Sequence, residues 1–182
     1  MQVFQTVHDI LKFNSQKNPD KVTISVNGLH YTNADILKNV ATLVEFLNKS
    51  EVSPGDRIAF LAKNSLEFIE LMYASSILEL VMVPINFRLA YEEVKFIIQD
   101  SGSKIIIFSE EFREIVEQVN SDKTDLQLSL GISELGELLK AKSSGALDVL
   151  LYSNKATNTP LFQIYTSGTT GNPKGALISQ KG

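Results

Sequence analysis

Apolar residues follow two different spacings along the chain, and these predict helices and strands in turn. Segments with an apolar residue at every third or fourth position predict amphipathic helices. Short runs that are almost entirely apolar predict strands covered on both faces, as in a parallel sheet. The two kinds of segment alternate at the spacing of β–α–β crossovers, which predicts an α/β fold with a doubly wound, mainly parallel sheet. The predicted helices cover residues 3–18, 33–49, 64–78, 91–100, 110–119 and 133–142, and the predicted strands of the sheet cover 58–62, 80–83, 104–109 and 126–130.

Two local signals near the start of the chain add detail to this pattern. Asn27 and Gly28 stand between two short apolar runs, which predicts a β-hairpin over residues 21–32. Thr32 or Asn33 is then expected to cap the helix that follows, because both side chains can accept a hydrogen bond from a backbone N–H of the first turn.

Composition excludes several classes of protein. The 182 residues are 43% hydrophobic and 21% charged, and 17 Lys and Arg against 21 Asp and Glu give a net charge of −4. No basic stripe is present, so nucleic acid is not an expected partner. Cysteine is absent, which excludes a disulfide scaffold and a cysteine-based metal site. The chain shows neither a signal-peptide pattern nor an apolar run approaching the ~20 residues that span a bilayer, so a cytoplasmic protein without a transmembrane segment is predicted.

The two histidines, His8 and His30, stand apart and without partners at metal-ligand spacing. We predict that both are ordinary surface or half-buried residues. Arg88 follows a predicted strand and is a candidate anion contact. A structural arginine beside a helix is the preferred interpretation.

The strongest candidate for chemistry is the stretch from Tyr165 to Gly175, which contains three glycines, four Ser and Thr side chains and one lysine. Glycines permit close backbone approach, and successive N–H groups with nearby hydroxyls can converge on an anion. Lys174 would add a mobile positive charge for phosphate oxygens. A Ser/Thr/Gly connecting loop or linker is the alternative. Phosphate binding is favoured because apolar runs flank the stretch on both sides and because Pro173 fixes the backbone directly before the lysine.

This stretch, Tyr-Thr-Ser-Gly-Thr-Thr-Gly-Asn-Pro-Lys-Gly, resembles the phosphate-loop signature of the adenylate-forming enzymes. That superfamily includes acyl-CoA synthetases, luciferases and the adenylation domains of peptide synthetases. Residues 55–59, 64–68 and 83–89 also look like stretches of acyl-CoA synthetases, and Pro-Ile-Asn-Phe-Arg-Leu at 84–89 favours that branch. The resemblance implies the N-terminal part of the adenylate-forming fold, with an α/β subdomain over 1–152 and a linker and strand–loop–strand phosphate-binding hairpin over 153–182.

The implied reaction joins a small carboxylic acid, a fatty or related acid, to the AMP part of ATP, which forms an acyl-adenylate and releases pyrophosphate. The acyl group is then transferred to coenzyme A. ATP, Mg²⁺ and coenzyme A are therefore the cofactors implied for the full-length parent. No metal ligand is assigned in this chain. Lys174 is the candidate catalytic cation, and the candidate phosphate cradle consists of Thr166, Ser167, Gly168, Thr169, Thr170 and Gly171. Tyr165 is expected to pack rather than react.

Three residues depart from the family pattern: Glu79 where a glycine is common, Leu161 where a smaller residue is usual, and Gln180 where many relatives have histidine. The relatives also continue for several hundred residues, which carry the adenine, ribose and metal contacts, the remainder of the AMP-binding domain and a C-terminal domain. We therefore expect the isolated chain to be inactive and expect self-association through an exposed strand edge at 176–178. The alternatives are a non-catalytic ATP-binding or regulatory remnant of such an enzyme and, more remotely, a flavodoxin-like interaction module.

Overall fold

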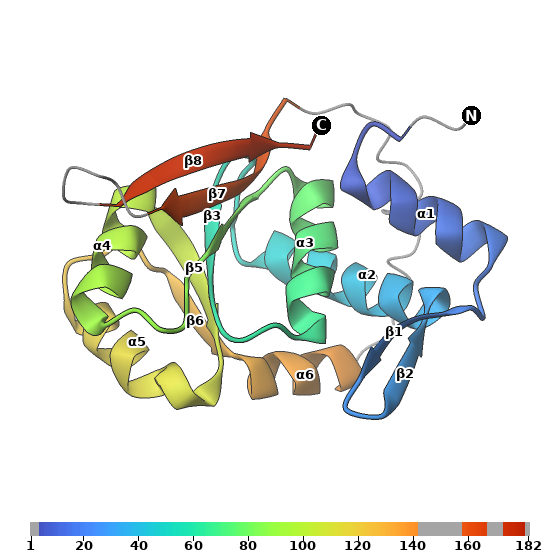
Figure 1. Cartoon of the computed structure of the whole chain (residues 1–182), viewed down its shortest axis with the longest axis horizontal. Helices are drawn as coiled ribbons and strands as arrows, with labels where there is room; N and C mark the ends of the chain where they lie inside the picture. The colour runs from blue at the N-terminus through green and yellow to red at the C-terminus, as the bar shows by residue number, and fades with distance from the viewer. Residues whose placement is uncertain (1–3, 142–157, 167–172, 181–182) are drawn as a thin grey trace.

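A computed structural model of the chain describes residues 4–141, 158–166 and 173–180. Within these residues a six-stranded sheet has the strand order β6-β5-β3-β4-β7-β8 (Figure 1). Neighbouring strands are parallel except β7 and β8, which are antiparallel. The strands are β3 (Arg57–Leu61), β4 (Val81–Pro84), β5 (Ser103–Phe108), β6 (Leu128–Gly131), β7 (Pro160–Thr166) and β8 (Lys174–Ser179).

Helices cover both faces of this sheet. On one face Ile58, Met82 and Ile105 pack with buried residues of α2, α3 and α6. On the other face Ala59 and Ile106 pack with α4 and α5. The helices are α1 (Val7–Lys17), α2 (Asn33–Lys49), α3 (Leu66–Leu78), α4 (Tyr91–Ser101), α5 (Arg113–Ser121) and α6 (Ile132–Ala141), with a 3-10 turn at Glu110–Phe112. The predicted doubly wound, mainly parallel α/β fold is confirmed.

The local signals near the N-terminus are also confirmed. β1 (Val22–Val26) and β2 (Leu29–Thr32) form an antiparallel hairpin, and its turn residues Asn27 and Gly28 have φ angles of 51° and 79°. Positive φ at both central residues is what a tight two-residue hairpin turn requires. Thr32 caps α2, because its Oγ1 accepts a hydrogen bond from the backbone N–H of Asp35 at 3.1 Å.

The first helix and the last strand begin at other residues than predicted. The first helix begins at Val7, and the carboxylate of Asp9 accepts the backbone N–H groups of Gln5 and Thr6, both at 3.0 Å. These hydrogen bonds satisfy donors before the first turn, so the predicted start at residue 3 was too early. The last strand begins at Lys174, two residues before the predicted apolar run.

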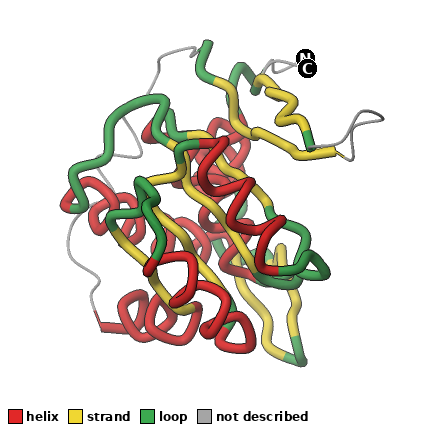
Figure 2. Tube along the Cα trace, turned by 90° about the vertical axis from the view of Figure 1, so that its left-hand side faces the viewer, coloured by secondary structure: helices red, strands yellow, loops and turns green. Residues whose placement is uncertain are grey.

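The β7–β8 hairpin lies at one edge of the sheet. In Figure 2 its two strands run along the upper edge of the molecule.

Within the described ranges, no helix is long and apolar enough to cross a membrane.

Candidate functional site

The stem of the β7–β8 hairpin brings two predicted site residues together. Thr166, the last residue of β7, lies opposite Lys174, the first residue of β8, and both are exposed. Side chains opposite each other in an antiparallel pair have Cβ atoms about 5 Å apart. The predicted cradle residues Ser167, Gly168, Thr169, Thr170 and Gly171 lie outside the described residues. The stem therefore holds the lysine at the mouth of the loop, as part of a strand rather than of the loop itself.

A chain of hydrogen bonds fixes this stem to the rest of the domain. The hydroxyl of Tyr165 donates to Asp100 Oδ2 at 2.5 Å and accepts from Gln163 Nε2 at 2.9 Å. The Oε1 atom of Gln163 accepts from Arg57 Nε at 3.4 Å. Asp100 belongs to the last turn of α4 and Arg57 begins β3, so the entry to the loop is tied to a helix and to a central strand.

The same surroundings keep Tyr165 in its donor form. Burial and the neighbouring Asp100 carboxylate raise the pKa of the Tyr165 hydroxyl well above its ordinary value. The residue is therefore a hydrogen-bonded support for the stem rather than a group ready to lose its proton at neutral pH.

Gly175 allows the close contact that this network requires. It lies opposite Tyr165 in the strand register. A Cβ atom added at Gly175 would lie 2.6 Å from Gln163 Nε2 and 3.0 Å from Tyr165 Cζ. Both separations are shorter than the 3.5–4.0 Å or so of ordinary van der Waals contact, so a larger residue would displace one of these side chains.

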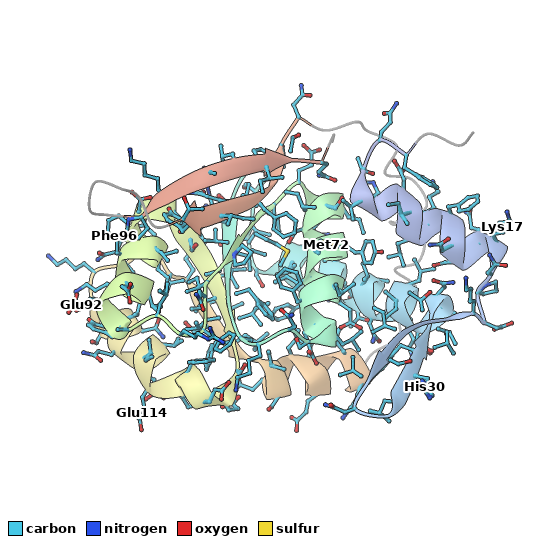
Figure 3. The ribbon with its side chains drawn as sticks, in the orientation of Figure 1. Lys17, His30, Met72, Glu92, Phe96 and Glu114 are labelled. Carbon is cyan, nitrogen blue, oxygen red and sulfur yellow. The ribbon has the colours of Figure 1, made fainter. Side chains whose placement is uncertain are left out.

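Helix α4 flanks the exit of the loop as well as its entry. A hollow of about 350 Å³ lies between Pro173, which directly precedes β8, and α4 residues that include Glu92, Phe96 and Gln99. Figure 3 labels Glu92 and Phe96 on this helix, below the end of the hairpin. The helix is itself held by an ion pair between Lys95 Nζ and Asp122 Oδ2 at 2.9 Å.

A second polar cluster joins the far end of β8 to α1 and α3. Gln180 Oε1 accepts from Ser76 Oγ at 2.5 Å, and Ser76 Oγ lies 2.8 Å from His8 Nδ1. His8 is only 4% exposed, so the prediction of a surface or half-buried residue was wrong for this histidine. Its burial follows from the packing of α1 against α3, which is a tertiary contact that the local pattern does not contain. His30 is exposed and lies 2.8 Å from Ser25 Oγ, as predicted for an ordinary surface histidine.

Three other residues that the sequence singled out, Arg88, Glu79 and Leu161, contact neighbouring parts of the domain. Arg88 is exposed, and its guanidinium lies 5.5 Å from the centre of the ring of the preceding residue, Phe87. Glu79 ends α3 with φ 57° and ψ 35°, a left-handed conformation that glycine adopts without strain. The turn is therefore of the kind that a glycine would favour, and Glu79 Oε2 accepts from Thr159 Oγ1 at 3.2 Å. Leu161 is buried.

The sequence did not identify Asp100, Gln163 or Arg57 as supports of the site. One available signal was the polar Gln163 inside an otherwise apolar run. Among the residues that the structure describes, no group of three or more His, Asp or Glu side chains is arranged to hold a metal ion.

The fold and the hairpin define an α/β domain of the adenylate-forming class. The chain belongs to the AMP-binding enzyme family, whose family model matches residues 11–182. It is 31% identical over 178 residues to a fatty acid–acyl-carrier-protein ligase of Streptomyces coeruleorubidus, covering 97% of this chain and 33% of that protein. It is 39% identical over 132 residues to a long-chain-fatty-acid–CoA ligase of Mycobacterium tuberculosis, covering 69% of this chain and 25% of that protein.

The fold comparison agrees with these relatives. A solved fatty acyl CoA synthetase of Mycobacterium tuberculosis superposes with a TM-score of 0.84 at 27% identity, covering 97% of this chain and 35% of that one. The chain thus spans between a quarter and about a third of the length of these relatives.

Proposed function

We propose that the chain is the N-terminal part of an AMP-forming acyl-CoA synthetase and that its β7–β8 hairpin holds the β- and γ-phosphates of ATP. The observation that carries the proposal is the register of the hairpin, which pairs Thr166 with Lys174 directly at the ends of a loop rich in glycine and hydroxyl groups. Two ligases of fatty acids among the relatives support a fatty or related carboxylic acid as the acyl substrate.

The residues of the loop have distinct proposed roles. Backbone N–H groups and hydroxyls of Thr166, Ser167, Gly168, Thr169, Thr170 and Gly171 would donate to phosphate oxygens. The Lys174 ammonium would offset the negative charge that grows on pyrophosphate as it leaves. The substrate carboxylate oxygen attacks the α-phosphorus, and the bond from that phosphorus to the oxygen bridging it to the β-phosphate breaks. Coenzyme A would then take the acyl group and release AMP.

Mg²⁺ is the metal that this class of reaction implies, where it neutralises phosphate charge. The described side chains do not form a site that fits the ion. We therefore assign no metal ligand among these side chains. The proposal for this chain rests on backbone donors, hydroxyls and one lysine.

Binding of polyphosphate by the chain tests the proposed grip. Titration with ATP and with inorganic tripolyphosphate, followed by calorimetry, is expected to show weak binding that Lys174→Ala reduces by at least about tenfold, because a charge-assisted contact contributes about 1.5–3 kcal/mol. Lys21→Ala is the matched control, since Lys21 is also exposed but lies beside the β1–β2 hairpin. Equal affinities in both variants would remove Lys174 from the site.

Turnover separates the catalytic proposal from the alternative of a non-catalytic ATP-binding remnant. The 182-residue chain is expected to release no pyrophosphate with ATP and fatty acids of short, medium or long chain, because alignment of the reacting atoms needs contacts beyond the phosphates. A protein that extends these residues through the whole family domain is expected to release it. Binding without release in that longer protein favours the remnant, and robust release by the 182 residues refutes the idea that they are only part of a site.

A further inference from the structure

A second cavity lies on the molecule away from the phosphate hairpin. It has a volume of about 450 Å³ and is formed by α2, α3, α6 and the β1–β2 hairpin, without any residue of β7 or β8. Figure 3 labels His30 on the hairpin at one side of this cavity, beside the end of α6. Its volume is within the range of about 300–1,000 Å³ that small-molecule sites occupy.

The deepest polar group of this cavity is the carboxyl of Glu70, on α3. Glu70 is 1% exposed. Its Oε1 atom accepts a hydrogen bond from Asn39 Nδ2 at 2.7 Å, but its Oε2 atom is buried and has no hydrogen-bond partner among the described residues. Burial, together with the charge of Glu67, raises the pKa of Glu70 to about 7. A buried carboxylate oxygen without a donor is unfavourable, so a ligand that supplies one would stabilise the ionised form.

The glutamate side chains of the cavity are less exposed than its lysines. Glu67, which is half-buried, and Glu70 are three positions apart on α3 and therefore share one face of the helix, and both line the cavity. Lys38 on α2 and Lys140 on α6 are exposed and line the rim. Asp35 also lies at the rim, but its carboxylate already accepts from the backbone and the hydroxyl of Thr32, at 2.8 and 2.6 Å.

Apolar side chains also line the cavity. Leu66 and Leu139 are buried residues of the wall, and the ring of Tyr31 is half-buried beside them. Such a wall suits a short aliphatic segment between two charged ends.

We propose that this cavity binds a small zwitterion, with a primary ammonium group directed to Glu70 and Glu67 and a carboxylate directed to Lys38 and Lys140. An ammonium group has three donors, which suit the unpaired Oε2 of Glu70 and the neighbouring Glu67. The two lysines then pair with the anionic end at the mouth. The site does not depend on the phosphate hairpin or on its proposed function.

The experiment uses γ-aminobutanoate as the zwitterion and compares it with butanoate and butylamine, which each carry one of its charges. Binding to the chain is followed by ¹H–¹⁵N chemical shifts, including the side-chain amide of Asn39. We expect γ-aminobutanoate to bind more tightly than either half-molecule. No binding of the zwitterion, or butylamine binding as tightly, would overturn the proposal.

Two variants locate the binding and a third controls for net charge. Glu70→Gln keeps the acceptor for Asn39 but removes the charge, and it is expected to weaken binding of γ-aminobutanoate by at least about tenfold. Gly136→Leu fills the cavity without altering a charge, because no atom lies within 4 Å of a Cβ built on Gly136, and it is expected to abolish binding. Glu114→Gln, on the exposed side of α5 (Figure 3), should bind as the unchanged chain does.

The variants also keep the test decisive if one of them misfolds. The circular dichroism spectrum identifies a misfolded variant, and the other cavity variant then carries the result. Unchanged affinity in a folded Glu70→Gln or a folded Gly136→Leu chain would show that the zwitterion binds elsewhere and would overturn the assignment.

Discussion

Replacing Gly175 by alanine tests whether the stem of the β7–β8 hairpin is as closely packed as the structure shows. The added methyl group would lie 2.6 Å from Gln163 Nε2, 3.0 Å from Gln163 Cγ and 3.0 Å from Tyr165 Cζ. Gln163 is not free to turn away without loss, because it accepts from Arg57 and donates to Tyr165. The substitution must therefore move the Gln163 side chain, the Tyr165 ring or strand β8.

The expected loss of stability depends on which group moves to make room for the methyl group. Inserting a methyl group into well-packed surroundings costs about 1–3 kcal/mol, and a lost neutral hydrogen bond costs about 0.5–1.5 kcal/mol. The nearest atom is the end of a flexible side chain, so the lower half of these ranges applies. We expect Gly175→Ala to lower the free energy of unfolding by about 1–2 kcal/mol and to weaken tripolyphosphate binding, because Lys174 is the adjacent residue.

Gly136→Ala is the matched control for this measurement. Gly136 lies inside α6, and a Cβ atom built there meets no atom within 4 Å. Alanine in a helix interior is more stable than glycine by about 0.5–1 kcal/mol, so this variant is expected to unfold at higher urea concentration, as followed by circular dichroism. Equal stability of the Gly175→Ala chain and the unchanged chain, or similar losses in both variants, would refute the packing argument.

Two further predictions concern pH and assembly. Because the pKa of Glu70 is raised from 4.5 to about 7, the folded state holds its proton more tightly than the unfolded state, and stability should fall by about 3 kcal/mol as the pH rises through that window. Urea unfolding across this pH window should show the fall in stability for the unchanged chain and not for Glu70→Gln. The pKa values of Asp9 and Asp35 are lowered, so these two groups make stability rise with pH, at pH values below the window. Strand β8 is an edge of the described sheet with Leu177 57% and Ile178 44% exposed, so we expect concentration-dependent self-association in sedimentation velocity. Leu177→Lys should reduce it, and an unchanged distribution would assign the association to another surface.

The parts of the fold that depend on local sequence could be predicted. The apolar runs that became β3, β4 and β5 are covered on both faces by helices, so nearly every residue in them had to be apolar. The turn at Asn27 and Gly28 and the cap at Thr32 depend on the conformations and hydrogen bonds of a few adjacent residues. These signals are therefore contained in short stretches of the chain.

Other features depend on contacts between distant segments. In the sheet, β7 pairs with β4. The sequence does not determine this pairing, because the apolar pattern of either strand is compatible with several neighbours. The burial of His8 depends on α1 packing against α3, and the unpaired oxygen of Glu70 depends on the packing of α2 against the same helix. No local sequence pattern around His8 or Glu70 indicates these contacts.

The β7–β8 hairpin depends both on local sequence and on contacts with distant segments, which limits what its motif alone can establish. Its glycines, hydroxyls and lysine predict the chemistry, because the donors that would grip a phosphate lie within eleven consecutive residues. The position of the hairpin's stem depends instead on hydrogen bonds of Tyr165 and Gln163, whose partners Asp100 and Arg57 are 65 and 106 positions away in the chain. A chain could keep the whole motif and lose both partners, and its loop would then present the same donors from a stem that is free to shift. Since displacement of reacting groups by about 1 Å can cost about a hundredfold in rate, such a chain would match the motif without forming a competent site.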